Sequence, residues 1–358
     1  MIPAAKPIIG DEERAAVDRV LATGQLAQGT EVAAFEQEFG DQVVGGRTCI
    51  AVNSGTSGQH LGLLAAGIGP GDEVIVPSFT FAATANSVAL TGATPVFADI
   101  EAGSFCLDPA AVEAAVTPRT KGVMPVHLYG HPADMTRLQE VADRHGLMVF
   151  EDAAQAHAAS WQGRPVGSFG TFAMFSLYPT KNMTSGEGGM VACEGDVARR
   201  VRLLRNQGME KQYENELVGL NNRMTNIHAA IGRVQLTKLA GWTKQRQDNA
   251  RFFDESIEGV GLPPVADGAT HVYHQYTIRV PGDRDRFAQA LREEHGVGCG
   301  VYYPIPNHRL PSFGLELDLP ETERAAREVL SIPVHPSLSQ DDLETVVAAV
   351  NACAKAGA

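Results

Sequence analysis

Short apolar runs alternate with longer amphipathic stretches through the first two thirds of the chain. The runs are rich in Val, Ile, Phe and Ala, are bounded by Gly, Pro or Asp, and have the length of β-strands. They span residues 49–53, 73–77, 94–99, 122–127, 147–151, 170–177 and 189–192. The stretches between them predict helices at residues 57–67, 81–90, 109–115 and 132–145. Several strands are apolar on both faces, so the pattern predicts an α/β domain whose sheet is covered by helices on each side.

The last third of the chain predicts a second, smaller unit. Residues 225–258 contain no proline and repeat apolar residues at helical spacing, which predicts a long helix leading out of the first domain. Examples of these apolar positions are Ile231, Val234, Leu236 and Leu239. The segment 259–268 carries two adjacent prolines and is typical of a linker. Strand patterns follow at residues 271–280 and 298–303, and helical patterns at 284–295 and 340–354. These elements predict a small α+β domain.

Chain length supports this division, because 358 residues exceed the size that a single core normally serves. We expect an N-terminal arm at residues 1–12, a large α/β domain at 13–240 and a small C-terminal α+β domain at 241–358. The long helix of about residues 225–258 would bridge the two domains.

Composition excludes several classes of protein. Apolar residues make up 44% and charged residues 20% of the chain, values typical of a globular protein and not of a disordered one. The formal net charge of −13 argues against a broad surface for nucleic acid. A local anion site made from backbone N–H groups is compatible with this charge, so phosphorylated small molecules are not excluded.

Cysteine and histidine spacing predicts neither disulfides nor a bound metal. The five cysteines are scattered and form no Cys-x-x-Cys pair, and the histidines do not follow the spacing of metal-binding motifs. No stretch has the apolar length of a signal-peptide core or of a membrane span. We therefore expect a cytoplasmic protein that binds neither membranes nor nucleic acid.

Three local patterns carry candidate chemistry. Glu151 and Asp152 follow an apolar strand, at the end where parallel strands place ligands. Lys181 lies in a tight turn after the strand pattern 170–177, where burial lowers the pKa of a lysine and suits its amine to covalent chemistry. The small residues 53–58 (NSGTSG) stand between a strand and a helix and suit an anion held by backbone N–H groups. Each pattern alone also fits an ordinary role, as solvated acids, a surface lysine or a helix cap.

One cofactor uses all three patterns together. Pyridoxal 5'-phosphate has a phosphate to anchor, a ring nitrogen to keep protonated, and an aldehyde that condenses with a lysine. A carboxylate, an amine and an anion cradle in one chain therefore predict this cofactor.

Longer strings of the sequence point the same way. NSGTSGQHLGLLAAGIGPGDEVIVPSFTFAATANSV, TPVFAD, PVHLYGHPADM, VFEDAAQAHAA, GSFGTFAMFSLYPTKN and GEGGM occur in this order. In these strings the chain resembles the DegT/DnrJ/EryC1/StrS aminotransferases, the sugar aminotransferases of the fold-type I pyridoxal phosphate superfamily. The resemblance extends from the AAKPIIGDEE start to LNNRMTNIHAAIGRVQL and, more loosely, to YYPIPNH. It implies an aspartate-aminotransferase-like α/β fold, with a mainly parallel seven-stranded sheet between helices in the large domain and a small C-terminal α+β domain.

The resemblance also implies site residues. Lys181 is then the lysine that binds the cofactor covalently and moves a proton during catalysis, and Asp152 pairs with the ring nitrogen. Phe81 stacks on the ring, and Gln155 lies near the ring or its phenolic oxygen. The implied phosphate site comprises Gly55, Thr56, Ser57 and Ser176. For Phe81 an alternative remains open, that of an ordinary core aromatic.

Two further assignments by resemblance are less definite. Asn221, in LNNRMT, matches a residue that reaches the phosphate from the neighbouring subunit, which implies a homodimer with shared active sites. The adjacent Asn222 and Arg223 leave the register of that loop open. His308, after YYPIPN, matches a histidine that contacts substrate, and a satisfied histidine at a domain interface is an equal alternative.

By resemblance, the chain is a pyridoxal-phosphate-dependent aminotransferase of amino-sugar, antibiotic or other natural-product biosynthesis. Its amino donor would be glutamate or glutamine, and its acceptor a keto group of a nucleotide-linked sugar or related cyclic polyol. Relatives that remove a hydroxyl group instead carry histidine in place of the lysine, so Lys181 favours transamination. A non-sugar substrate, another reaction on the same cofactor and a non-catalytic regulator are the alternatives. The sequence leaves open the identity of donor and acceptor and the stereochemistry of amination.

Overall fold

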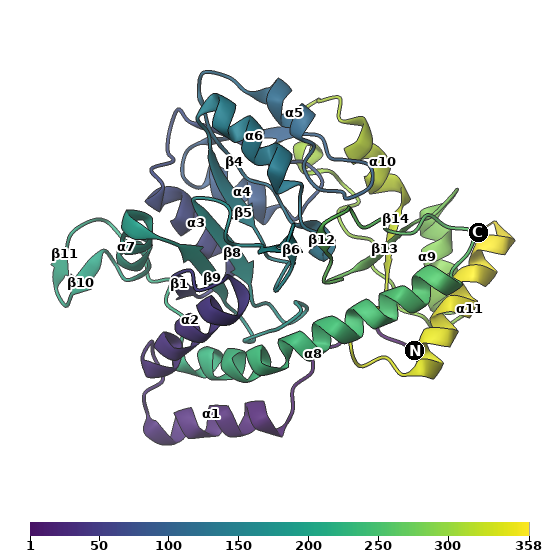
Figure 1. Cartoon of the computed structure of the whole chain (residues 1–358), viewed down its shortest axis with the longest axis horizontal. Helices are drawn as coiled ribbons and strands as arrows, with labels where there is room; N and C mark the ends of the chain where they lie inside the picture. The colour runs from purple at the N-terminus through teal and green to yellow at the C-terminus, as the bar shows by residue number, and fades with distance from the viewer. Residues whose placement is uncertain (358) are drawn as a thin grey trace.

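A seven-stranded sheet forms the centre of the large domain in the computed structural model, which describes residues 1–357 (Figure 1). Its strands are β1 (Cys49–Val52), β2 (Glu73–Pro77), β3 (Thr94–Ala98), β4 (Thr120–Val123), β5 (Met148–Asp152), β8 (Phe172–Ser176) and β9 (Gly189–Cys193). The strand order is β1-β9-β8-β5-β4-β2-β3. Strand β9 runs antiparallel to both neighbours, and the other pairings in this sheet are parallel. The predicted mainly parallel sheet is confirmed.

Helices cover both faces of the sheet. In β1, Ile50 and Val52 pack toward one face and Ala51, between them, toward the other, because successive side chains of a strand alternate. The first face is covered by α3 (Gly55–Ala65), α4 (Ala83–Ala89) and α7 (Gly195–Arg205). The opposite face is covered by α2 (Thr30–Val43), α5 (Pro109–Ala115), α6 (Met135–His145) and the first half of α8 (Asn226–Ser256).

The helix predicted over residues 225–258 is α8, which runs from the sheet to the small domain (Figure 1). Its second half packs through Ala250 and Phe253 into the core of the small domain. That domain contains β13 (Tyr276–Arg279), β14 (Val329–Ile332), α9 (Arg284–Glu293) and α11 (Gln340–Ala356). The start of the chain joins it, since Ile2 forms a β-bridge with Val297. Helix α1 (Asp11–Thr23) lies along α8, outside the two helix layers (Figure 1).

The remaining elements are short. They are η1 (Leu128–Gly130), β6 (Ser160–Trp161), β7 (Arg164–Pro165), β10 (Met209–Lys211), β11 (Glu214–Asn215), β12 (Ala269–Thr270), η2 (Asn307–Arg309) and α10 (Pro320–Glu328). No helix within the described residues is long and apolar enough to cross a membrane.

The strand predicted over residues 298–303 is wrong. Only Gly300 forms a bridge there, with Ser331. Tyr303 has a φ of 58°, and a backbone in this left-handed region leaves the extended geometry that a strand needs. The segment instead turns toward the edge of the large sheet.

Two other predicted elements are shorter in the structure. The strand predicted over 271–280 is reduced to β13, because the N–H groups of Val272 and Gln275 donate to carbonyls of η1. The helix predicted over 132–145 begins three residues later as α6. The carboxylate of Asp134 accepts a backbone N–H of its first turn and so caps it.

Candidate active site

A cavity of about 380 Å³ opens at one edge of the large sheet. The carboxyl ends of β5 and β8, the N-termini of α3 and α4, and the turn after β8 all contribute lining residues. Of the residues implied by resemblance, those that line it are Gly55, Thr56, Phe81, Asp152, Gln155, Ser176 and Lys181. Side chains from distant parts of the sequence therefore meet in one place.

Asp152 ends β5 and is only 4% exposed. Its Oδ2 accepts hydrogen bonds from Gln59 Nε2 (2.5 Å) and Thr84 Oγ1 (2.8 Å), and its Oδ1 accepts one from the Ala154 N–H (3.1 Å). Each partner is a donor, which suits an ionised carboxylate. Helices α3 and α4 thereby hold a negative charge at the wall of the cavity.

Lys181 lies in the turn that follows β8. Its backbone N–H donates to the carbonyl of Tyr178 (3.0 Å), which closes the turn. Burial lowers the pKa of Lys181 to about 8, and the charge of Asp152 opposes this shift. At neutral pH the amine is deprotonated far more often than that of an exposed lysine, and the deprotonated amine is the form that attacks an aldehyde.

The N-terminus of α3 forms a wall suited to an anion. Ser54 Oγ caps the helix by accepting the N–H of Ser57 (3.1 Å), while Gly55 and Thr56 line the cavity. A Cβ on Gly55 would lie 3.1 Å from the Cβ of Ser176, so a side chain there would crowd β8. Free N–H groups of the first turn and the helix dipole attract an anion at this point. Ser57 itself lies outside the cavity lining, and the cap occupies its N–H.

Gln155 and Phe81 both line the cavity, in different ways. Gln155 Oε1 accepts the N–H of Tyr129 (2.7 Å), and its Nε2 donates to Tyr303 Oη (2.9 Å). Phe81 is 63% exposed and precedes α4, so the helix predicted from residue 81 begins later than expected. The core alternative for Phe81 is therefore wrong, and its ring is accessible from the cavity.

Neither Asn221 nor His308 lines the cavity of its own chain. Asn221 is exposed and forms a bridge with Asn206. His308 is fully buried, with Nδ1 2.7 Å from Ser78 Oγ and Nε2 3.3 Å from the carboxylate of Glu323. This position matches the alternative of a histidine at a domain interface, and the expected substrate contact has no support within the chain.

Sequence patterns did not predict the two side chains that hold Asp152. Gln59 is 1% exposed and follows Gly55 by four positions, so helical spacing alone places both on one face of α3. No spacing in the sequence pointed to Thr84, because its hydrogen bond to Asp152 joins α4 to β5. Tyr178, Glu187 and His274 are further lining residues that carried no prediction.

A model of the DegT/DnrJ/EryC1/StrS aminotransferase family matches residues 7–351. The chain belongs to this family. The "Pleiotropic regulatory protein" of Geobacillus stearothermophilus is 46% identical to it, over 83% of this chain and 82% of the relative. The dTDP-3-amino-3,4,6-trideoxy-alpha-D-glucose transaminase of Streptomyces venezuelae is 42% identical, over 95% of this chain and 91% of that enzyme. The crystal structure of S. venezuelae DesV in complex with a ketimine intermediate has a TM-score of 0.92 and 41% identity, covering 96% of this chain and 95% of that one.

As a DegT-family member, the chain is a pyridoxal-phosphate-dependent aminotransferase with the fold of these enzymes. The cavity fits the cofactor, because a carboxylate fixed by donors suits a protonated ring nitrogen and an amine with a lowered pKa suits the aldehyde. The close packing of Gly55 against β8 leaves backbone at the cavity wall, where a phosphate can approach it. Among residues 1–357, no group of three or more potential metal ligands occurs.

Proposed function

We propose that this DegT-family enzyme transfers an amino group from glutamate or glutamine to the keto group of a nucleotide-linked sugar or a related cyclic polyol. The observation that carries the proposal is the meeting of Lys181, Asp152 and the N-terminus of α3 in one cavity. Pyridoxal 5'-phosphate bound there supplies a ring that accepts electrons from the substrate carbon. The side chains of the cavity supply the binding and the proton transfers.

Asp152 and Lys181 have complementary roles in this proposal. The Asp152 carboxylate holds a proton on the ring nitrogen, and its hydrogen bonds from Gln59 and Thr84 keep it aimed there. Lys181 binds the cofactor covalently at rest. Once released, its amine would move a proton between the two carbons that flank the substrate nitrogen, and a pKa of about 8 suits an amine that acts as both base and acid.

The remaining cavity residues would bind and orient the cofactor. The backbone of Gly55 and Thr56 and the hydroxyl of Ser176 would hold the phosphate, while Phe81 would cover the ring. Gln155 would lie beside the ring or its phenolic oxygen. Ser57 would contribute mainly by completing the cap of α3.

A carbohydrate acceptor is supported by hydroxyl groups that line the cavity and by the relatives. Hydroxyl-bearing side chains that line it include Thr80, Tyr178, Thr180, Tyr302 and Tyr303. The names of relatives refer to dTDP-, UDP- and GDP-linked or derived amino sugars. These names, together with the hydroxyl groups of the lining, favour a sugar over an apolar ketone.

We propose that the enzyme works as a cytoplasmic homodimer with shared active sites. Lys181 is the one Lys or Arg side chain that lines the cavity within residues 1–357, so an acceptor diphosphate needs cations from elsewhere. A second subunit would supply them, and Asn221 of that subunit would reach the phosphate of the cofactor. Exposed apolar side chains support a partner surface, with Tyr213 85% and Val218 95% exposed close to Asn221 in sequence.

The two half-reactions test the function directly. Purified enzyme loaded with pyridoxal 5'-phosphate is mixed with glutamate or glutamine, and we expect its visible absorption to give way to that of the aminated cofactor. The aminated enzyme is then screened with nucleotide-linked keto sugars and with simple cyclic ketones. No spectral change with any amino acid would contradict transamination, and reaction with simple ketones alone would contradict the nucleotide-linked acceptor.

The name of the Geobacillus relative favours a regulator as the second candidate function. Lys181→Ala separates the two functions, because a regulator can act without a covalent bond to the cofactor. We expect this variant to lose both the borohydride-reducible adduct and turnover. Retention of the adduct would show that another lysine binds the cofactor.

A further inference from the structure

A buried carboxylate lies next to Asp152 and takes no part in the mechanism above. Glu151 is 1% exposed, and its side chain leaves β5 on the face opposite to Asp152. Its Oε2 accepts the N–H of Gly167 (2.7 Å), and its Oε1 accepts those of Phe169 (2.7 Å) and Gly170 (2.9 Å). Burial raises the pKa of Glu151, but the hydrogen bonds from His127 and from the backbone outweigh burial and leave the pKa below its ordinary value.

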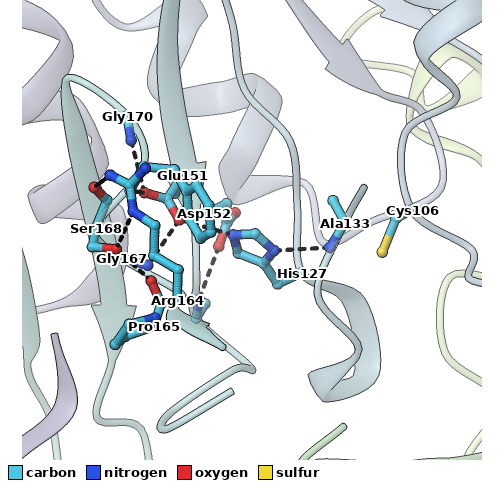
Figure 2. Close-up of polar contacts among 12 residues, drawn as sticks. Cys106, His127, Ala133, Glu151, Asp152, Arg164, Pro165, Gly167, Ser168 and Gly170 are labelled. Atoms are coloured by element: carbon cyan, nitrogen blue, oxygen red, sulfur yellow. Dashed lines mark hydrogen bonds and ion pairs between the residues drawn. The ribbon is translucent and has the colours of Figure 1, made fainter. Parts of the chain in front are cut away.

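His127 completes this arrangement from the neighbouring strand segment. Figure 2 shows its ring between Glu151 and the backbone of Ala133. Nδ1 accepts the Ala133 N–H (3.0 Å), so the ring proton lies on Nε2, 3.3 Å from Glu151 Oε2. The same residue also holds Asp152 through the main chain, because the His127 N–H donates to the Asp152 carbonyl (3.0 Å). His127 is therefore tied to both acids that end β5.

The segment after His127 holds the other polar group of the cavity. Tyr129, in η1, has a φ of 58°, which costs free energy for a residue with a side chain and persists only when neighbours fix it. Its N–H donates to Gln155 Oε1 (2.7 Å). Glu151 is thus hydrogen-bonded to His127, and two residues further along the main chain Tyr129 is hydrogen-bonded to Gln155. Neither Glu151 nor His127 lines the cavity.

We propose that Glu151 and His127 are positioning residues that hold Asp152 and Gln155 where the cofactor ring binds. This inference rests on the proposed function, in which Asp152 and Gln155 meet the ring. The buried charge of Glu151 is satisfied only when the 167–170 loop, β5 and the His127 segment are assembled together. One carboxylate thereby fixes the end of β5 from the face that the cofactor does not touch.

Glu151→Gln tests the proposal without any substrate. Glutamine keeps the shape of the side chain but puts an NH₂ group against backbone donors, so the end of β5 would shift. We expect the dissociation constant for pyridoxal 5'-phosphate to rise about tenfold, which is the typical effect of losing a residue that orients a binding residue without touching the bound group. We also expect the pH midpoint of the bound cofactor's visible absorption to move in the same direction as in Asp152→Asn.

Glu73→Gln is the matched control. Glu73 is 5% exposed in the same sheet, is hydrogen-bonded to Thr117 and Arg119, and lies at the end of β2 that is remote from the cavity. We expect it to lower the melting temperature while leaving both cofactor measurements at wild-type values. If Glu151→Gln behaves in the same way as Glu73→Gln, Glu151 only stabilises the fold and the inference is overturned.

His127 provides a second pair of variants in case Glu151→Gln does not fold. In His127→Gln the side-chain amide can still donate a hydrogen bond to Glu151. The shorter side chain of His127→Asn places its amide only where the histidine Nδ1 lies, so the contact with Glu151 is lost. We expect His127→Gln to bind the cofactor more tightly than His127→Asn, and equal affinities would overturn the inference. An unchanged spectrum in Asp152→Asn would overturn the proposed site and this inference together. If the cofactor spectrum changes in Asp152→Asn but not in Glu151→Gln, only this inference is overturned and the proposed site stands.

Discussion

At the scale of single residues, hydrogen bonds fix the position of the Asp152 carboxylate. Two helices donate hydrogen bonds to its Oδ2, from Gln59 (2.5 Å) and Thr84 (2.8 Å), and a backbone N–H donates to its Oδ1. These donors give the buried carboxylate hydrogen-bond partners in a place where an unpartnered polar group would be costly. An anion held in this way stabilises a proton on a nearby ring nitrogen.

Asp152→Asn removes that charge with little change of shape. We expect kcat to fall at least about 100-fold, because an amide cannot hold the positive ring nitrogen as a carboxylate does. Steady-state turnover and the absorption spectrum of the bound cofactor measure the effect. The melting temperature of the apo-protein serves as the control for folding, and undiminished turnover would remove Asp152 from its proposed role.

Lys181 links function to stability through its pKa. Burial lowers the pKa from 10.5 to about 8, so unfolding of the apo-protein takes up a proton between these two pH values. The free energy of unfolding therefore rises with pH across that window. Below about pH 8, the wild-type apo-protein bears the full cost of a buried ammonium group.

Lys181→Met should stabilise the apo-protein at neutral pH. We expect a gain of up to about 3 kcal/mol at about pH 7, which shrinks as pH rises from about 8 toward 10.5. Urea unfolding of both apo-proteins across this range measures the difference. A gain that does not depend on pH would show that the ammonium group is not the source of the instability.

At the scale of elements, the N-terminus of α3 depends on close contact with β8. A Cβ on Gly55 would lie 3.0 Å from Met174 Sδ and 3.1 Å from the Cβ of Ser176, both on β8. Real side chains rarely pack this tightly, so an alanine there would push the first turn of α3 outward. The backbone N–H groups at the cavity wall would move with it.

Gly55→Ala tests this contact. We expect it to destabilise the protein by about 1–3 kcal/mol and to weaken binding of pyridoxal 5'-phosphate. Gly241→Ala is the matched control, because Gly241 is exposed on α8 and a Cβ added there would meet no atom within 4 Å. That change should stabilise the protein by about 0.5–1 kcal/mol through helix propensity and leave cofactor affinity unchanged. Thermal unfolding and cofactor titration distinguish the two variants. Unaltered cofactor affinity in Gly55→Ala would contradict a phosphate site at the N-terminus of α3.

At the scale of the whole molecule, the proposed second subunit would have exposed apolar side chains to cover. Helix α1 packs on α8 through Ala16 and Val20, but Leu21 is 53% exposed. Phe81 is 63% exposed at the cavity itself. In the proposed dimer, side chains of this kind would be candidates for the contact surface.

Mixed dimers test whether Asn221 acts across subunits. We expect Lys181→Ala and Asn221→Ala to be poorly active alone and to regain activity when combined in one dimer. In the mixed dimer, one site would pair an intact Lys181 with an intact Asn221 of the other subunit. Sedimentation velocity establishes the dimer and turnover measures the rescue. No rescue, or a fully active monomer, would contradict the shared site.

Predictions from sequence succeeded where the signal is local. The strand at 73–77 and the helix at 109–115 have their predicted bounds in β2 and α5, because their apolar patterns end at clear turn residues. The helices α1, α2, α7 and α10 were not predicted. The strand predicted at 298–303 failed because the backbone of Tyr303 is left-handed, a conformation that its neighbours impose and its own residue type does not favour.

Reading the chain alone was enough to show which residue types are available for chemistry and on which elements they lie. Motifs around Lys181 and Asp152 are contiguous, so their strand ends and turns could be recognised without knowing the packing. Folding in three dimensions selects which groups meet: Gln59 and Thr84 at Asp152, His127 at Glu151, and His308 at Ser78 rather than at the cavity. The physical reason is that a buried polar atom must find a partner wherever packing places one, and packing is set by the whole core.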